Sequence, residues 1–227
     1  MKHLSLLLAG ALVLALSSAA LAADAAGGGT YLVRHFDGMP GKAAQVLALT
    51  RQYAVAARKE PGAIAVDAYQ EVERPDRFVL VEHWRDKAAA DAHDKSLADF
   101  RQTLAPLMMS DFGKRIHSPF VMDPSAVATP PGALTVLGHF DVFGPFTQQA
   151  VALVTAQAEA ARKDPGVIRY DVLRWDGHAN HFTLVEVWRD AKARVAATAL
   201  PHNLEFRSKS TALEGAPYDD RSYRRLD

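Results

Sequence analysis

Hydrophobic positions follow first a strand period and then a helical period, and this order occurs twice along the chain. Apolar and polar residues alternate over residues 30–36 and again over 134–140, which predicts a β-strand at each place. Apolar or small residues then recur at helical spacing and predict a helix in each half: Leu47, Thr50, Ala54 and Ala57 in the first, Val151, Val154, Ala158 and Ala161 in the second.

The string AARKEPG at residues 56–62 marks the end of the first predicted helix, and AARKDPG at 160–166 marks the end of the second. Arg58 and Lys59 place positive charge at the negative end of the helix dipole. Pro61 cannot continue the helix, and Gly62 accepts the positive φ that a tight exit needs. The repeated string therefore predicts a structural stop between a helix and a strand.

Two further strands follow in each half and predict hairpins, at 63–72 with 78–85 and at 167–175 with 182–189. A helical stretch then covers residues 87–105. At the equivalent place in the second half Pro201 interrupts the pattern, where a new helix can begin. A last strand is predicted at 114–121, with a weaker counterpart near 221–226.

The two halves are copies of one unit. From His35 to Asp86, 22 of 52 residues are identical to those 104 positions later, without a gap. The match indicates a duplication with repeat one at 30–121 and repeat two at 134–227. Residues 122–133, rich in Pro and small side chains, predict the linker between them.

Each repeat has the order β-α-β-β-α-β, the ferredoxin-like arrangement of an α+β fold. A four-stranded sheet of this kind carries helices on one face and leaves the other apolar face to be covered. Two tandem copies can cover each other, so we expect a pseudo-dimer within one chain. Further oligomerisation stays open.

The first residues predict export. Lys2 and His3 precede an apolar run at 4–16, and Ala20 and Ala22 have the small-residue spacing of a signal cleavage site. We therefore expect residues 1–22 to be a signal peptide, no membrane span after its removal, and a periplasmic or secreted protein. Lys and Arg number 26, as do Asp and Glu, so nothing favours nucleic acid as a partner.

Three segments together resemble the antibiotic biosynthesis monooxygenase (ABM) family of dimeric α+β barrels: the helix end EPG, the strand FVLVEHWRD and the following AHDKSLADF. In that family two single-domain chains usually form the barrel, and the resemblance implies that the two repeats take those roles here. It also implies cofactor-free oxygenation of quinols or anthrone-like polyketides, with haem degradation as the activity of another branch.

The candidate chemistry centres on an E-x-W element that both repeats carry. Glu82 and Trp84, like Glu186 and Trp188, lie two residues apart on a strand and share a face. An indole offers an apolar wall and one N–H donor for an aromatic substrate. The alternative is a core tryptophan beneath the helices.

His93 follows Trp84 on the next helix. The resemblance implies a catalytic pair of Trp84 and His93, since the haem-degrading branch places a histidine at about this position. A neutral imidazole could take a phenolic proton or ligate iron, and the alternative is a solvated helix residue. Repeat two has Ala197 there, which favours repeat one as the active copy.

His35 and His139 occur at the same position of the first strand in both repeats and are candidate substrate-binding residues, or structural hydrogen-bonding partners at the strand end. The chain lacks a metal-binding motif such as HExxH, and no metal is expected. The haem-degrading branch has an asparagine on the first strand, where this chain has Arg34 and Gly138. Haem is therefore the minor alternative to no cofactor.

The sequence thus predicts an exported, cofactor-independent monooxygenase-like protein that acts on a small electron-rich aromatic such as a quinol. The alternative is a binding protein, without turnover, for a hydrophobic small molecule or haem. In either case one repeat can serve as scaffold only.

Overall fold

The computed structural model describes residues 28–125 and 128–226. Repeat one contains β1 (Thr30–Asp37), α2 (Ala43–Ala57), β2 (Ala63–Glu71), β3 (Arg77–Trp84), α3 (Lys87–Ser96), α4 (Ala98–Leu104), the 3₁₀ turn η1 (Ala105–Leu107) and β4 (Arg115–Val121). Repeat two contains β5 (Leu134–Asp141), the 3₁₀ turn η2 (Gly144–Phe146), α5 (Thr147–Ala161), β6 (Val167–Trp175), β7 (His181–Trp188), α6 (Ala191–Ala197), α7 (Pro201–Ser210) and β8 (Asp219–Arg225).

The duplication is visible in the element boundaries. Each strand of repeat two begins and ends 104 residues after its counterpart, and so does α5 relative to α2. The second helical region is where the repeats differ. There α6 ends at Ala197 and Pro201 opens α7, as the sequence predicted.

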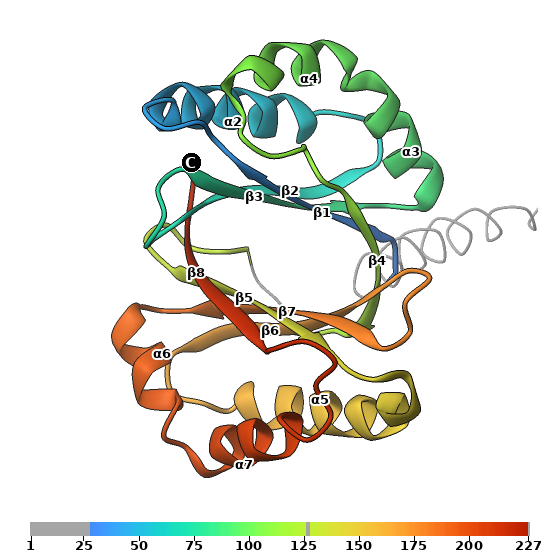
Figure 1. Ribbon diagram of the computed structural model, residues 1–227, viewed down its shortest axis with the longest axis vertical. Helices are drawn as coiled ribbons and strands as arrows, with labels where there is room; N and C mark the ends of the chain where they lie inside the picture. The colour runs from blue at the N-terminus through green and yellow to red at the C-terminus, as the bar shows by residue number, and fades with distance from the viewer. Residues whose placement is uncertain (1–27, 126–127, 227) are drawn as a thin grey trace, which may run out of the picture.

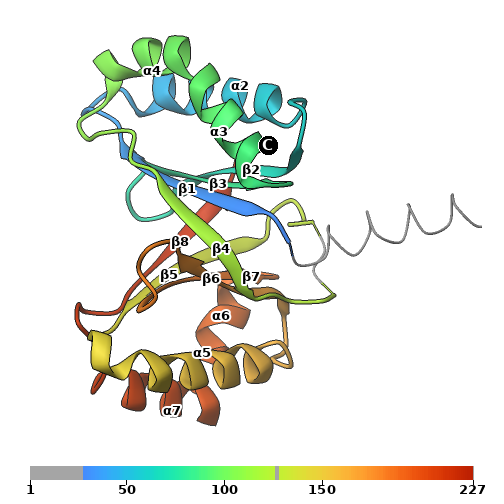
Figure 2. The same cartoon turned by 90° about the vertical axis from the view of Figure 1, so that its right-hand side faces the viewer.

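The eight strands close into one antiparallel barrel in the order β1-β3-β2-β8-β5-β7-β6-β4. The last strand of each repeat crosses to the other: β4 pairs with β1 and with β6, and β8 pairs with β5 and with β2. The helices cover the two outer faces (Figure 1), and Figure 2 shows β4 running from one sheet to the other. The predicted α+β pseudo-dimer is confirmed, and the exchange leaves neither repeat with an open sheet edge.

Alternation along the strands separates two kinds of core. On β1, Leu32 and Phe36 face α2 and its neighbours, whereas Val33 faces the barrel interior. The interior core joins both repeats through Val33, Tyr69, Val79, Val81, Leu137, Leu173, Val185 and Tyr223. Since burying one large apolar side chain contributes about 1.5–3 kcal/mol, this shared core stabilises the pairing of the repeats.

The predicted glycines follow the first helix of each repeat, and an aspartate caps the start of the second. Gly62 and Gly166 have φ of 86° and 92°, the left-handed conformation needed after α2 and α5. Asp86 and Asp190 begin α3 and α6 and accept hydrogen bonds from the backbone N–H groups of Ala89 and Ala193.

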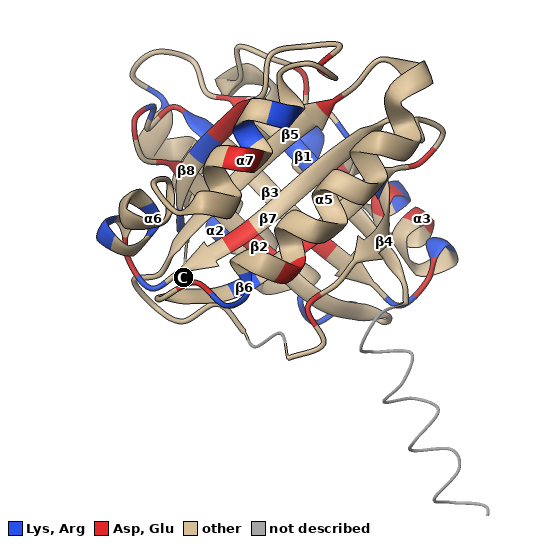
Figure 3. Cartoon of the chain, turned by 90° about the horizontal axis from the view of Figure 1, so that it is seen from below, with Lys and Arg blue, Asp and Glu red and all other residues tan. Residues whose placement is uncertain are grey.

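The expected signal peptide at 1–22 lies outside the described residues. Among the helices that the structure does describe, none has the length and apolar character to span a bilayer. Basic and acidic residues are interspersed on the face of repeat two that α5 and α7 cover (Figure 3), in keeping with the balanced charge of the sequence.

Candidate functional site

The E-x-W element forms the same fixed unit in both repeats. On β3, the indole N–H of Trp84 donates to the Glu82 carboxylate at 3.1 Å. On β7, Trp188 donates to Glu186 at 2.8 Å. All four side chains lie between the sheet and the helices, and the tryptophans are 0% and 2% exposed. Each indole therefore orients a buried carboxylate.

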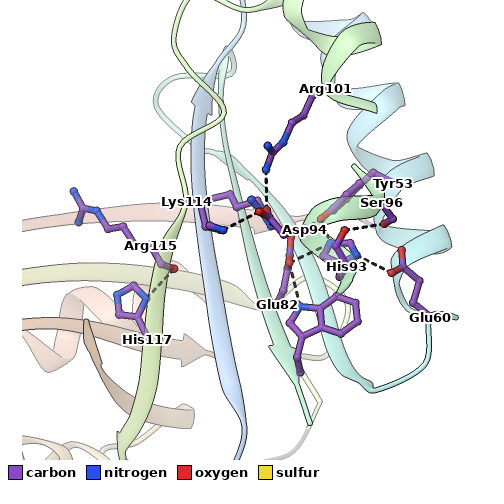
Figure 4. A network of polar contacts seen from close by, with 12 residues as sticks. Tyr53, Glu60, Glu82, His93, Asp94, Ser96, Arg101, Lys114, Arg115 and His117 are labelled. Carbon is purple, nitrogen blue, oxygen red and sulfur yellow. Dashed lines mark hydrogen bonds and ion pairs between the residues drawn. The ribbon is translucent and has the colours of Figure 1, made fainter. Parts of the chain in front are cut away.

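In repeat one, this carboxylate belongs to a closed polar network (Figure 4). Arg34 approaches Glu82 at 3.0 Å, and the Tyr53 hydroxyl donates to Glu82 at 2.5 Å. His93 Nε2 lies 2.7 Å from the Tyr53 oxygen, and His93 Nδ1 lies 2.8 Å from Glu60. The His93 side chain is fully buried and stacks on the Trp84 ring at 4.3 Å.

The surroundings of His93 favour its cationic form. Burial alone would lower its pKa, but the hydrogen bonds and charges of Glu82 and Glu60 outweigh burial and raise it. Because Tyr53 donates its proton to Glu82, His93 Nε2 donates to Tyr53, while Nδ1 donates to Glu60. An imidazolium with both N–H groups engaged is suited to holding the network rather than to accepting a substrate proton.

The same contacts bear on haem. Iron ligation needs a ring nitrogen of neutral imidazole, and both nitrogens of His93 are engaged within the protein. Arg34, on the strand where the resemblance would place an asparagine, is buried against Glu82. The residues of repeat one in this arrangement do not fit a haem.

Repeat two has a cavity of about 260 Å³ at the equivalent place, between the sheet and α6 and α7. Four substitutions between the repeats accompany it, three of them to smaller side chains. Arg34, Tyr53, Val66 and His93 of repeat one correspond to Gly138, Gln157, Tyr170 and Ala197. The polar and aromatic residues of its wall are Gln157, Tyr170, Glu186, Arg194, Thr198, Asn203, Phe206, Arg207, Tyr218 and Asp220.

The carboxylate of repeat two acquires its counter-charge from a different element. Arg194, on α6, lies 3.0 Å from Glu186 and 2.8 Å from Asp220. Arg34, which has the same task in repeat one, comes from β1. Gly138 stands where repeat one has Arg34, and the Tyr218 side chain occupies the space beside it. A Cβ added at Gly138 would lie only 2.6 Å from the Tyr218 hydroxyl oxygen.

The twin glutamates have pKa values displaced in opposite directions. Burial is the largest influence on both and raises the pKa. For Glu82 the hydrogen bond from His93 and the charge of Arg34 outweigh burial, and the pKa falls below its ordinary value. For Glu186 burial prevails over Arg194 and Trp188, and the pKa is raised. A raised glutamate pKa in a cavity suits a general base that works near neutral pH.

Two donors and one acceptor complete the cavity. Burial raises the pKa of Tyr170 and of Tyr218 well above 10, so both phenols keep their protons. The side-chain oxygen of Gln157 is buried and, within the described residues, has no hydrogen-bond partner. A phenolic O–H in the cavity would satisfy it.

His35 and His139 lie on the opposite face of the sheet from the E-x-W units. They point into the barrel interior, where their rings meet across the repeats with centroids 5.2 Å apart. They join His117, whose Nε2 lies 3.0 Å from the Thr183 hydroxyl. Within residues 28–125 and 128–226, no group of three or more His, Asp or Glu side chains is placed to hold a metal ion.

The residues that sequence reasoning missed are Tyr170, Arg194 and Tyr218. Their signal was available, because all three occur where the repeats differ, opposite Val66, Ala90 and Lys114. Glu186 and Trp188 are identical in the two repeats, and the sequence therefore predicted these two as site residues instead.

The architecture defines a class of protein, the α+β barrel built from two ferredoxin-like units, here within one chain. The profile of the antibiotic biosynthesis monooxygenase family matches residues 30–105 and 133–209, one match in each repeat. The chain belongs to this family. No curated protein matches it in sequence.

Solved structures with the same fold extend over almost the whole chain. A candidate monooxygenase of Fusobacterium nucleatum is 14% identical, with a TM-score of 0.75, and the match covers 87% of this chain and 92% of that one. A candidate monooxygenase of Lactobacillus acidophilus is also 14% identical, with a TM-score of 0.69 and coverage of 87% and 94%. An anthrone oxidase-like protein is 12% identical, with a TM-score of 0.70 and coverage of 88% and 92%.

Proposed function

We propose that the protein is a monooxygenase of small electron-rich aromatics such as quinols, and that repeat two holds its active site. One observation carries the proposal: the cavity of about 260 Å³ has a buried carboxylate, Glu186, whose pKa burial raises, beside the guanidinium of Arg194. A cavity of this volume accommodates a ligand of one or two rings. One structure of similar fold is named anthrone oxidase-like.

In the proposed reaction, Glu186 accepts the proton of a phenolic hydroxyl. Protonation of Glu186 weakens its ion pair with Arg194, whose positive charge then stabilises the phenolate. Tyr170 and Tyr218 remain protonated and can donate to the second oxygen of a hydroquinone. The aromatic wall and the buried position exclude water from the anion.

The phenolate supplies the electrons, so the proposed reaction requires neither metal nor flavin. One electron passes from the hydroquinone anion to O₂, and the two radicals combine with formation of a ring C–O bond. The O–O bond then breaks as water leaves, and the ring carbon loses its proton. The sum is hydroquinone plus O₂ giving hydroxyquinone plus water: the ring loses four electrons and retains one oxygen atom of O₂.

The assignment of His93 and Trp84 as the catalytic pair stays a prediction and places the reaction in repeat one. It requires the network around Tyr53 and Glu60 to open, because the His93 side chain is fully buried. A substrate that binds in the cavity of repeat two requires no hydrogen-bond network to open.

Oxygen uptake by chelator-treated protein tests the proposal, with 1,4-hydroquinone and 1,4-naphthohydroquinone as substrates. We expect uptake above the buffer rate and transfer of one ¹⁸O atom from labelled O₂ to the product, whereas autoxidation releases hydrogen peroxide instead. Removal of a general base costs about 10²–10⁴-fold in rate, so Glu186→Gln should lose at least about a hundredfold.

The twin residue provides a matched control. Glu82→Gln, or Trp84→Phe if that variant is unstable, should keep the rate of wild type. Loss of activity in these variants and its retention in Glu186→Gln would locate the reaction in repeat one. Saturable binding of naphthohydroquinone without oxygen uptake would instead favour the second function, a binding protein for hydrophobic small molecules.

We also propose that the protein acts after export, as the composition of residues 1–22 suggests. Intact-mass measurement of protein recovered from its native envelope or medium should give a chain that begins near Ala23.

A further inference from the structure

We propose that one end of the barrel interior is a second binding site, between the repeats, for a small aromatic carboxylate. This site goes beyond the proposed oxidation and is separate from the cavity of repeat two. It is a cavity of about 470 Å³ whose walls come from both repeats: β1 and β4 on one side, β5, β6 and β8 on the other. The residues that carry the inference are His35, Arg115, His139, Trp175, Arg221 and Tyr223.

Basic residues exceed acidic residues around this cavity. Its wall contains Arg77, Lys114, Arg115 and Arg221 but only Asp37 and Asp219 as acids. Three of the four cations have carboxylate partners: Arg77 lies 2.9 Å from Asp37, Lys114 2.8 Å from Asp94, and Arg221 2.7 Å from Asp219.

Arg115 is different. In the part of the chain that the structure describes, no carboxylate lies within ion-pair distance of its guanidinium. The guanidinium lies over the Trp175 ring, 4.8 Å from its centroid. A guanidinium placed over an indole can keep its edge available for the two parallel hydrogen bonds that a carboxylate accepts.

The histidines add neutral donors rather than charge. The pKa of His35 is lowered to about 3 and that of His139 to about 4; burial is the main cause for both, and Arg115 contributes to each. His35 Nε2 is buried and, among the described residues, has no hydrogen-bond partner. A neutral imidazole with a vacant ring nitrogen can donate one hydrogen bond to a ligand oxygen.

The remaining wall is aromatic. Trp175 and Tyr223 contribute rings from β6 and β8. The edges of His35 and His139 meet nearby at a T-shaped contact. A flat aromatic ring can pack against these aromatic side chains, and one carboxylate on it can accept hydrogen bonds from the Arg115 guanidinium.

Trp175 provides a direct readout. The chain has three tryptophans, and Trp84 and Trp188 are 0% and 2% exposed on the far side of the sheets. Trp188 lies beside the repeat-two cavity, so a change in tryptophan fluorescence on addition of 2-naphthoate or benzoate reports on Trp175 when it persists in Trp188→Phe, and calorimetry gives the dissociation constant independently. The neutral amide 2-naphthamide has the same shape without the charge.

We expect saturable binding of 2-naphthoate, and binding of 2-naphthamide weaker by about 10- to 100-fold, since a hydrogen bond to a charged group contributes about 1.5–3 kcal/mol. Arg115→Gln should weaken naphthoate binding by a similar factor. Arg189→Gln, an exposed arginine paired with Asp190, should bind as wild type. Glu186→Gln should also bind as wild type, which keeps this site distinct from the repeat-two cavity.

Equal affinity for naphthoate and naphthamide in wild type would overturn the proposal without any variant. Naphthoate binding unchanged in a folded Arg115→Gln, or abolished in Glu186→Gln, would overturn it as well.

Discussion

His117 offers a test of the barrel interior through the pH dependence of stability. Its side chain is 1% exposed, and burial lowers its pKa to about 3, with the neighbouring His139 and the charge of Arg115 adding to the effect and a backbone hydrogen bond opposing it. Its Nδ1 lies 3.3 Å from the carbonyl oxygen of Arg115, and its Nε2 lies 3.0 Å from the Thr183 hydroxyl. The folded protein therefore holds a neutral imidazole near neutral pH.

The sign and size of the effect follow from proton binding. The unfolded chain protonates this imidazole near pH 6.5, whereas the folded chain keeps it neutral down to about pH 3. Between these values the unfolded state binds more protons, so the free energy of unfolding falls as the pH falls. At about 1.36 kcal/mol per pH unit, lowering the pH from 6.5 to 5.0 costs about 2 kcal/mol from this residue alone.

The perturbation is His117→Asn, which retains polar groups but cannot titrate. Urea unfolding at pH 7.5 and pH 5.0 gives the loss of stability over this interval for each protein. Wild type should lose about 2 kcal/mol more than the variant, and any cavity left by the smaller side chain cancels in the comparison. His178→Asn, at an exposed turn, serves as control and should lose as much as wild type. Equal losses for wild type and His117→Asn would refute a neutral His117.

Three further outcomes are expected. His93→Gln should lower the free energy of unfolding by about 1.5–3 kcal/mol at pH 6, because it removes the charged hydrogen-bond partner that joins Tyr53 to Glu60; urea unfolding measures this. The raised pKa of His93 makes its contribution largest below pH 6.5 and lost as the pH rises through the folded pKa, so the gap to wild type should narrow at alkaline pH. Arg194→Gln should raise the pKa of Glu186 further, and the acid limb of the pH–rate profile should move to higher pH, because the base must be ionised. Gly138→Ala should place a Cβ against the Tyr218 hydroxyl and raise KM for naphthohydroquinone while the thermal unfolding transition persists; an unchanged KM would show that this wall does not meet the substrate.

The fold could be predicted because its signals are local. The spacing of apolar residues and the Pro-Gly helix stop recur 104 residues apart, and each depends only on residues that lie close together in the sequence. The pairing of the two sheets also followed, because each repeat has one apolar sheet face that its own helices do not cover.

The location of the open cavity could not be predicted in the same way, because it depends on side chains that meet across elements. His93 favoured repeat one in the sequence, yet its partners Tyr53 and Glu60 come from other segments and enclose it. In repeat two, the loss of an arginine from β5 and its gain on α6 leave a void between them. Neither the loss of the arginine from β5 nor the gain of one on α6 predicts a cavity by itself.

The most direct measurement is a crystal structure of the protein with 1,4-naphthohydroquinone bound under anaerobic conditions. We expect the ligand between Tyr170, Glu186 and Tyr218, with one hydroxyl within hydrogen-bond distance of the Glu186 carboxylate. A ligand bound beside His93 in repeat one, or a repeat-two cavity that stays empty at saturating ligand, would contradict an active site at Glu186.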